Sequence, residues 1–95
     1  MNQLVLSACI AEAHAPRYTP AGMPALDLRL EHESQMLEAG TTRQVKAAIK
    51  AVAFGAVAEM LGQRPIGSAG RFKGFLATPR NGKYVVIHIQ EFLQD

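Results

Sequence analysis

The clearest pattern in the chain is an alternation of apolar and charged residues between Ala25 and Ser34. A period of two with one apolar face and one charged face is typical of a strand in an antiparallel sheet with a solvated side. We therefore predict a strand over these residues. The face toward the core would hold Leu26, Leu28 and Leu30. The solvent-exposed face would hold Asp27, Arg29, Glu31 and Glu33.

The segment from Asn2 to Ala13 also alternates, but both of its faces are largely apolar. One face would carry Leu4, Leu6, Ala8 and Ile10, and the other Val5, Ser7, Cys9 and Ala11. This pattern predicts a strand that is covered on both sides. A second subunit is one candidate for the outer cover.

Two further strands are predicted near the C-terminus. Arg71 to Ala77 forms the first, and its central Gly74 fits a bulge or a sharp bend. Tyr84 to Phe92 forms the second, with Val85, Ile87 and Ile89 on one side. Between the two strands, Pro79 to Lys83 contains the Asn-Gly pair that type I′ hairpins favour.

Segments rich in turn-forming residues separate these strands. His14 to Pro24 holds three prolines and a glycine, which predicts a loop or a hairpin. Gln35 to Thr42 is predicted to be a connecting loop that Gly40 closes, and Arg64 to Gly70 a further turn. Ala56 to Leu61 is predicted to be a short helix that ends at Gly62.

The stretch from Arg43 to Phe54 is ambiguous. Its alanines and lysines slightly favour a helix by propensity alone. As a strand, it would place Lys46 and Lys50 on the outer face, and Val45, Ala47, Ile49, Ala51 and Ala53 on the inner face. The order of the elements favours the strand, because a five-stranded Greek-key barrel of the OB type carries its helix between strands 3 and 4. We therefore predict an all-β OB barrel with that helix.

Composition agrees with this fold and excludes other classes. Apolar residues make up 48% of the 95, which excludes a disordered chain, and we expect residues 1–95 to form one domain. No apolar run approaches the roughly 20 residues of a membrane span. The first residues lack the basic region of a secretory signal, and the single Cys9 cannot form an internal disulfide. We therefore expect a cytoplasmic protein without membrane contact. Its formal charge of +2 is only a weak bias toward an anionic partner.

The pattern of reactive residues gives no support for catalysis. His14, His32 and His88 are far apart and have no metal-ligand spacing, and there is no second cysteine. Cys9 lies in the middle of a predicted strand, where an inert buried thiol is the usual case. No glycine cluster has the spacing of a phosphate-binding loop. We expect a protein that is not an enzyme and that needs no cofactor or metal.

Several motifs resemble those of bacterial single-stranded-DNA-binding OB domains. Asn2 to Ser7 and Arg17 to Pro24 are similar to the opening strand and the first turn of that family. Leu28 to Ser34 resembles the Leu-Glu-His-x-Ser signature of primosomal replication protein N, the PriB type. Glu38-Ala39-Gly40 and Gly74-Phe75-Leu76 extend the resemblance over nearly the whole chain. The chain stops at Asp95 without the long, acidic-tipped tail of the binding proteins, which favours the PriB type.

The resemblance implies a homodimeric accessory protein without catalysis of its own. Members of this family bind single-stranded DNA and join a restart helicase of the PriA type, with other primosome proteins, at stalled replication forks. A single-stranded-DNA-binding protein is a further expected partner. The alternative is a protein-interaction adaptor on the same fold that hardly touches DNA.

Eight residues are candidates for the DNA contact, because cations can track phosphates and rings can stack on bases. Lys46 occupies a position where relatives of this type carry an aromatic stacker, and Glu33 one where a relative carries a basic residue. The turn around Asn81 is also shorter and less basic than in relatives. These differences predict weaker, salt-sensitive binding. The candidates are Arg17, Tyr18, Arg43, Lys46, Lys50, Arg80, Lys83 and Tyr84.

Overall fold

The computed structural model describes all residues from Met1 to Asp95 and contains six strands and one helix. Its elements, in chain order, are β1 (Leu4–Ala13), β2 (Arg17–Tyr18), β3 (Pro24–Glu38), β4 (Thr41–Phe54), α1 (Ala56–Gly62), β5 (Ala69–Ala77) and β6 (Val86–Gln94). No helix in this structure has the length and apolarity needed to cross a membrane.

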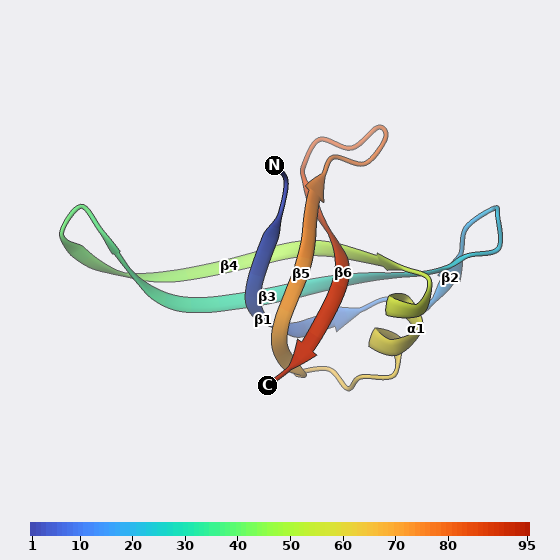
Figure 1. The fold of residues 1–95 in the computed structure, drawn as a ribbon, viewed down its shortest axis with the longest axis horizontal. Coiled ribbons are helices and arrows are strands. Elements are labelled where there is room, and N and C mark those ends of the chain that lie inside the picture. The colour runs from blue at the N-terminus through green and yellow to red at the C-terminus, as the bar shows by residue number, and fades with distance from the viewer.

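The five long strands close into a barrel (Figure 1). They follow one another in the order β1, β5, β6, β4 and β3, and β3 pairs with β1 again to complete the circle. Every pairing is antiparallel except that of β4 with β6, which is parallel. With α1 between the third and fourth long strands, this is the predicted OB barrel, and the fold prediction is confirmed.

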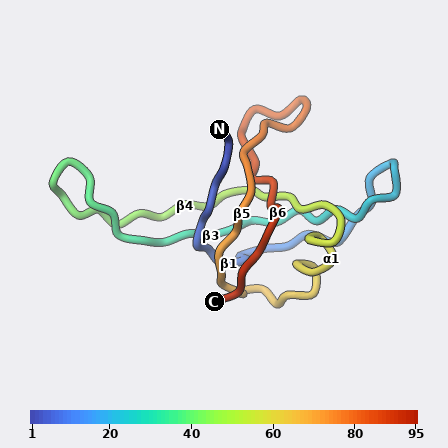
Figure 2. The backbone as a smooth tube through the Cα atoms, in the orientation of Figure 1, coloured from blue at the N-terminus to red at the C-terminus, as the bar shows by residue number.

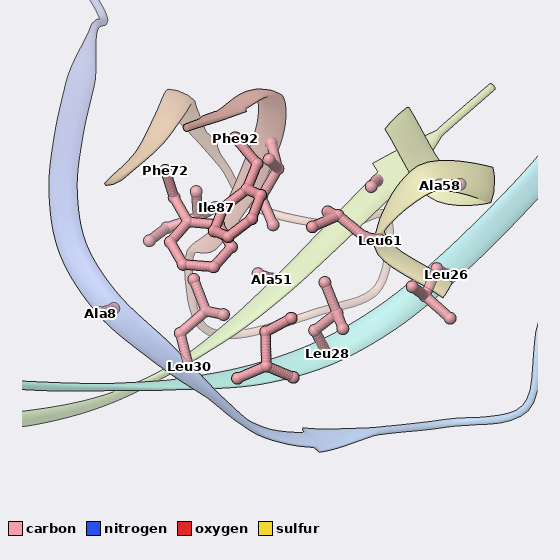
Figure 3. Packing of buried hydrophobic residues seen from close by; sticks show 13 residues of the cluster. Ala8, Leu26, Leu28, Leu30, Ala51, Ala58, Leu61, Phe72, Ile87 and Phe92 are labelled. Carbon is pink, nitrogen blue, oxygen red and sulfur yellow. The ribbon is translucent and has the colours of Figure 1, made fainter. Parts of the chain in front are cut away.

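The barrel interior is filled by the apolar faces of the strands. Leu26, Leu28 and Leu30 are at most 3% exposed, as the alternation in β3 predicts. The rings of Phe72 and Phe92 meet at 4.7 Å between centroids. Figure 3 shows these side chains converging with Leu61, which α1 directs toward the core from one side of the barrel.

The ambiguous stretch from Arg43 to Phe54 is part of strand β4. The helix that propensity slightly favours is wrong there, and the strand that the fold placement favours is confirmed. Tertiary pairing overrides propensity. β4 pairs with β3 along its whole length and with β6 near its end, and this two-sided pairing buries Ala51, Val52 and Ala53.

The predicted connecting loop from Gln35 to Thr42 is wrong. β3 continues to Glu38, and only Ala39 and Gly40 separate it from β4. Both residues have positive φ, 50° and 78°, as a two-residue type I′ turn requires. The resulting β3–β4 hairpin extends beyond the barrel (Figure 2). Sequence pattern misses it because no core faces its outer half, so its side chains do not alternate.

The connection between β5 and β6 also differs from the prediction. The bulge predicted near Gly74 is confirmed by a register shift between Lys73 and Gly74, with the extra residue, Gln90, on β6. The type I′ hairpin is wrong, because only Asn81 has positive φ, at 65°, and an eight-residue loop joins the strands. This 78–85 loop contains Tyr84 and Val85, so β6 begins at Val86.

Candidate nucleic-acid interface

The eight predicted contact residues are spread over a molecule that is 50 Å long. Arg17 and Tyr18 form β2 at one end, while β4 carries Arg43, Lys46 and Lys50. Arg80, Lys83 and Tyr84 lie in the 78–85 loop, which projects from the barrel between β2 and the tip of the β3–β4 hairpin (Figure 1). The eight residues therefore do not form one cluster, and each group has its own surroundings.

Arg17 is held by an acid of strand β3. Its Nε donates to Asp27 Oδ2 at 2.6 Å and its Nη2 to Asp27 Oδ1 at 3.1 Å. The hydrogen bond from Arg17 lowers the pKa of the Asp27 carboxyl, and the same hydrogen bond raises the pKa of Arg17. Arg17 is thus already neutralised by a bidentate partner.

Arg29 is a second cation whose charge is matched on the same side of β3. Its Nη1 donates to Glu31 at 2.7 Å, and its Nε lies 3.5 Å from Glu12 Oε2. The hydrogen bond to Glu31 raises the pKa of Arg29. Farther along, Glu33 accepts a hydrogen bond from the Gln44 amide at 3.0 Å. The outer face of β3 therefore carries acids and self-paired charges.

The outer face of β4 is different. Lys46 and Lys50 are exposed, and neither takes part in any of the six ion pairs of the structure. They lie roughly 13 Å apart along the strand, given about 3.3 Å per residue. Lys50 stands directly across from the paired Arg29, and Lys46 across from Glu33. These two lysines are free to meet an anion.

Arg43 does not join these lysines. Side chains alternate along a strand, so Arg43 lies on the opposite face of the β3–β4 hairpin from Lys46. Its Nη1 donates to Glu38 at 2.7 Å, next to the turn. The structure therefore places Arg43, like Arg17, in an ion pair and away from the free cations of β4.

The 78–85 loop supplies two more free cations. Arg80 and Lys83 are exposed and have no acidic partner, and the Tyr84 side chain beside them is 81% exposed. A groove of about 470 Å³ lies between this region and β4, because it is lined by Lys50 and by Val86, where the loop enters β6. Glu12, Asp27 and the paired Arg29 also line this groove. Lys50 and the start of β6 thus border one groove, whereas Lys46 lines another groove with Glu31 and Glu33.

Tyr18 lies apart from that surface. It is 72% exposed and lines a separate groove of about 300 Å³ between β2 and α1. The groove also contains Arg17, whose charge is paired, and Glu59, which carries a negative charge. No free cation therefore lies beside Tyr18 in this groove to bind a phosphate backbone.

Sequence reasoning missed three rings on the outer face of the barrel. His88 on β6 contacts both Phe54 on β4 and Phe75 on β5, and Phe54 is 37% exposed. The alternation of β4 already puts Phe54 on the same face as Lys50. The other two could not be placed beside it, because that needs the register between β4, β6 and β5.

The other histidines have local roles. His32 Nδ1 lies 2.6 Å from the Ser7 carbonyl, which can only accept, so this nitrogen carries the proton and donates. His32 Nε2 lies 2.8 Å from Ser34 Oγ, and His14 lies 3.6 Å from Glu12. No group of three or more His, Cys, Asp or Glu side chains is arranged to hold a metal ion.

The arrangement suits an extended polyanion with flat groups. Lys46, Lys50, Arg80 and Lys83 are exposed cations without acidic partners, and exposed rings lie beside them at Phe54 and Tyr84. Cations attract phosphates, and rings provide faces on which bases stack. The free cations and the rings occur together on the β4 side of the barrel, next to the 78–85 loop.

Comparison with known proteins agrees with this geometry. A family described as another single-strand binding protein family matches residues 2–91. The chain is 47% identical over 92 residues to the replication restart protein PriB of Bordetella pertussis, across 96% of this chain and 86% of the relative. The solved structure of PriB from Ralstonia solanacearum matches with a TM-score of 0.91 at 35% identity, covering 99% of this chain and 97% of that one. The wild-type single-stranded DNA binding protein from Thermus aquaticus matches with a TM-score of 0.77 at 25% identity, covering 99% and 50%. The chain therefore belongs to this single-strand binding protein family and, within it, to the PriB replication restart proteins.

Proposed function

We propose that this protein binds single-stranded DNA and acts as an accessory protein of replication restart. The observation that carries the proposal is the set of unpaired cations on β4 and in the 78–85 loop, Lys46, Lys50, Arg80 and Lys83. They lie on an OB barrel, whose long strands and loops often bind oligonucleotides. The names of the similar proteins support the same role.

Contacts with phosphates, rather than with bases, contribute most of the binding free energy. Each cation that neutralises a phosphate releases a counterion, so affinity falls as salt rises, with a slope of about 0.7 per contact on single strands. A stacked base adds roughly 1–3 kcal/mol. Because Lys46 offers a charge and no ring, one such stack is missing on β4. We therefore expect weak binding that depends steeply on salt.

We further propose a restart helicase of the PriA type as the protein partner. The rival is an adaptor that uses its surface mainly for that helicase and hardly touches DNA. One observation favours the rival in part: the outer face of β3 carries Glu31, Glu33 and self-paired charges, which repel phosphates rather than attract them. That face is available to a protein while β4 meets DNA.

We also infer a homodimer that forms along β1. The edge of β1 that faces away from β5 has no strand partner between Leu4 and Ala8, and its Ser7 carbonyl is bonded to the His32 side chain. Val5 on this segment is 58% exposed. A second copy of the strand satisfies the free backbone groups. Sedimentation at micromolar concentration is expected to give the dimer mass, and a monomer mass would contradict this inference.

The first test of the function is fluorescence anisotropy with labelled oligo-dT and a matched duplex, each titrated at low and at physiological salt. The proposal predicts a preference for the single strand that weakens as salt rises. No binding of oligo-dT even at low salt would contradict DNA binding and would favour the adaptor.

A matched pair of triple variants separates the two functions. Lys46→Gln, Arg80→Gln and Lys83→Gln together remove three free cations, and we expect oligo-dT binding and stimulation of the restart helicase to fall together. Arg17→Gln, Arg29→Gln and Arg43→Gln remove three paired cations and serve as the control with equal net charge. Helicase stimulation that survives the first triple variant, while DNA binding is lost, would identify the adaptor.

A further inference from the structure

Three rings form a row across three strands on the outside of the barrel. The imidazole of His88 on β6 stacks on Phe75 of β5, with 4.8 Å between ring centroids and 16° between planes. On its other side, Phe54 of β4 lies 5.9 Å away at 34°. Phe75 and His88 are half-buried, so the row borders solvent.

The register of the strands sets this row. His88 is paired with Val52 on β4 and with Phe75 on β5. Its neighbours Ile87 and Ile89 are buried in the core, so His88 points outward. Gly74 allows the close approach of β5 to β6, because a Cβ there would collide with the His88 carbonyl. The bulge beside Gly74 thus holds Phe75 against the imidazole.

Cations flank the row on both sides. On β4, Lys50 precedes Val52 by two residues and therefore shares the outer face. On β5, Lys73 precedes Phe75 by two residues, although its Nζ lies 3.9 Å from Glu91. Arg71, two residues farther along β5, is exposed and has no acidic partner. The row therefore has positive charges beside it on β4 and β5, whereas β6 contributes none.

The outer face of β3 has no such pattern. It presents no aromatic ring, and its one arginine, Arg29, is paired with Glu31 and Glu12. A single strand that crosses from β4 onto β3 would meet acids and no stacking surface. A strand that crosses from β4 toward β6 and β5 meets rings and then the unpaired Arg71. Charge and stacking therefore favour the second direction.

We infer that a nucleobase of single-stranded DNA packs edge-to-face on the solvent-facing rim of the ring row at Phe75 and His88, so that the strand leaves β4 across β6 and β5. This inference rests on the proposed DNA binding and adds a base-binding subsite to it. This contact compensates for the stack that Lys46 cannot make. An edge-to-face aromatic contact adds about 0.5–1.5 kcal/mol, which corresponds to about a two- to twelve-fold change in affinity.

Photocrosslinking locates the base directly. Oligo-dT that carries 5-iodouracil is bound to the intact protein, irradiated, and digested with trypsin for mass spectrometry. We expect crosslinks at Phe75 or at His88, in the peptides that cover residues 74–80 and 84–95. Crosslinks confined to β3, to β4 or to the 78–85 loop would overturn the subsite and leave the DNA binding itself intact.

Two variants of one residue test the energetic contribution. His88→Ala is expected to weaken oligo-dT binding at least two-fold, whereas His88→Phe keeps a ring and is expected to retain most of the affinity. Ile66→Ala removes an exposed side chain in the turn before β5, away from the ring row and from Lys50, and is the control. If His88→Ala fails to fold, the phenylalanine variant and the crosslinks decide. Unchanged affinity in a folded His88→Ala protein would overturn the subsite, and absent binding by the unmodified protein would overturn the proposed function as well.

Discussion

The outer faces of β3 and β4 lie side by side in one hairpin, yet the cations on the β3 face are in ion pairs and those on the β4 face are not. Arg29 on β3 and Lys50 on β4 are direct cross-strand neighbours. Arg29 is paired with Glu31 and Glu12, whereas Lys50 has no acidic partner. The same contrast separates Arg17, which Asp27 holds, from Lys46, which is free.

This difference shows why counting basic residues says little about DNA binding. An exposed ion pair adds at most about 1 kcal/mol to stability, and it leaves its cation with a partner that a phosphate would have to displace. A free cation needs no such exchange and releases a counterion when it binds a phosphate. A net charge of +2 can therefore hide one face that attracts phosphates and one that does not.

The largest expected effect comes from giving the β4 face the ring that it lacks. Lys46→Trp replaces a free cation by a stacking platform on the same outer face. Base stacking adds roughly 1–3 kcal/mol, while one phosphate contact is lost. We expect oligo-dT to bind about five-fold more tightly at physiological salt and with a weaker salt dependence, measured by anisotropy.

The matching change on the other strand is the control for that result. Glu31→Trp puts the same ring on the outer face of β3, and we expect it to leave the affinity within about two-fold, since no base stacks there. Equal gains from both tryptophans would mean that the two faces are not distinct. No gain from Lys46→Trp would mean that DNA does not pass over β4.

Much of the fold can be predicted from the sequence alone, because the core strands show a local alternation of apolar and polar residues. The alternation in β3 finds Leu26, Leu28 and Leu30, and the order of elements identifies the barrel even where propensity favours a helix. The outer half of the β3–β4 hairpin is missed, because it packs on no core and Ala39 is an unusual residue for a turn with positive φ.

The candidate site is harder to predict, because it depends on which charges find partners. The alternation in β4 puts Lys46 and Lys50 on one outer face, and the structure agrees. Asp27 neutralises Arg17, which is ten residues away along the chain, because β2 pairs with β3. The sequence does not show this pairing. The contact of Phe75 with His88 likewise needs the β5–β6 register.

A smaller effect is expected from breaking a pair on the β3 face. The pKa of Asp27 is lowered in the folded protein, mainly by its hydrogen bond to Arg17. The pair therefore stabilises the fold above the ordinary aspartate pKa of 3.8, and this contribution is lost as pH falls through the lower folded-state pKa. Asp27→Asn is expected to reduce the free energy of unfolding at pH 7 by about 0.5–1 kcal/mol.

Urea denaturation at neutral pH and near pH 3 measures this contribution. The difference between Asp27→Asn and the unchanged protein should shrink as the pH falls, since the aspartate of the unfolded chain becomes protonated first. A difference that stays constant with pH would show that the ion pair is not its source. Because Arg17 is then released, oligo-dT binding by this variant should stay equal or rise slightly.

The comparison of the two faces is tested most directly by the salt dependence of oligo-dT binding in two single variants, Lys50→Gln and Arg29→Gln. Both lose one positive charge, and the two positions are cross-strand neighbours. We predict that Lys50→Gln lowers the slope of log affinity against log salt by about 0.7, whereas Arg29→Gln leaves it unchanged. The reverse result, or equal slopes in the two variants, would contradict the conclusion that free cations on β4, and not paired cations on β3, bind the DNA.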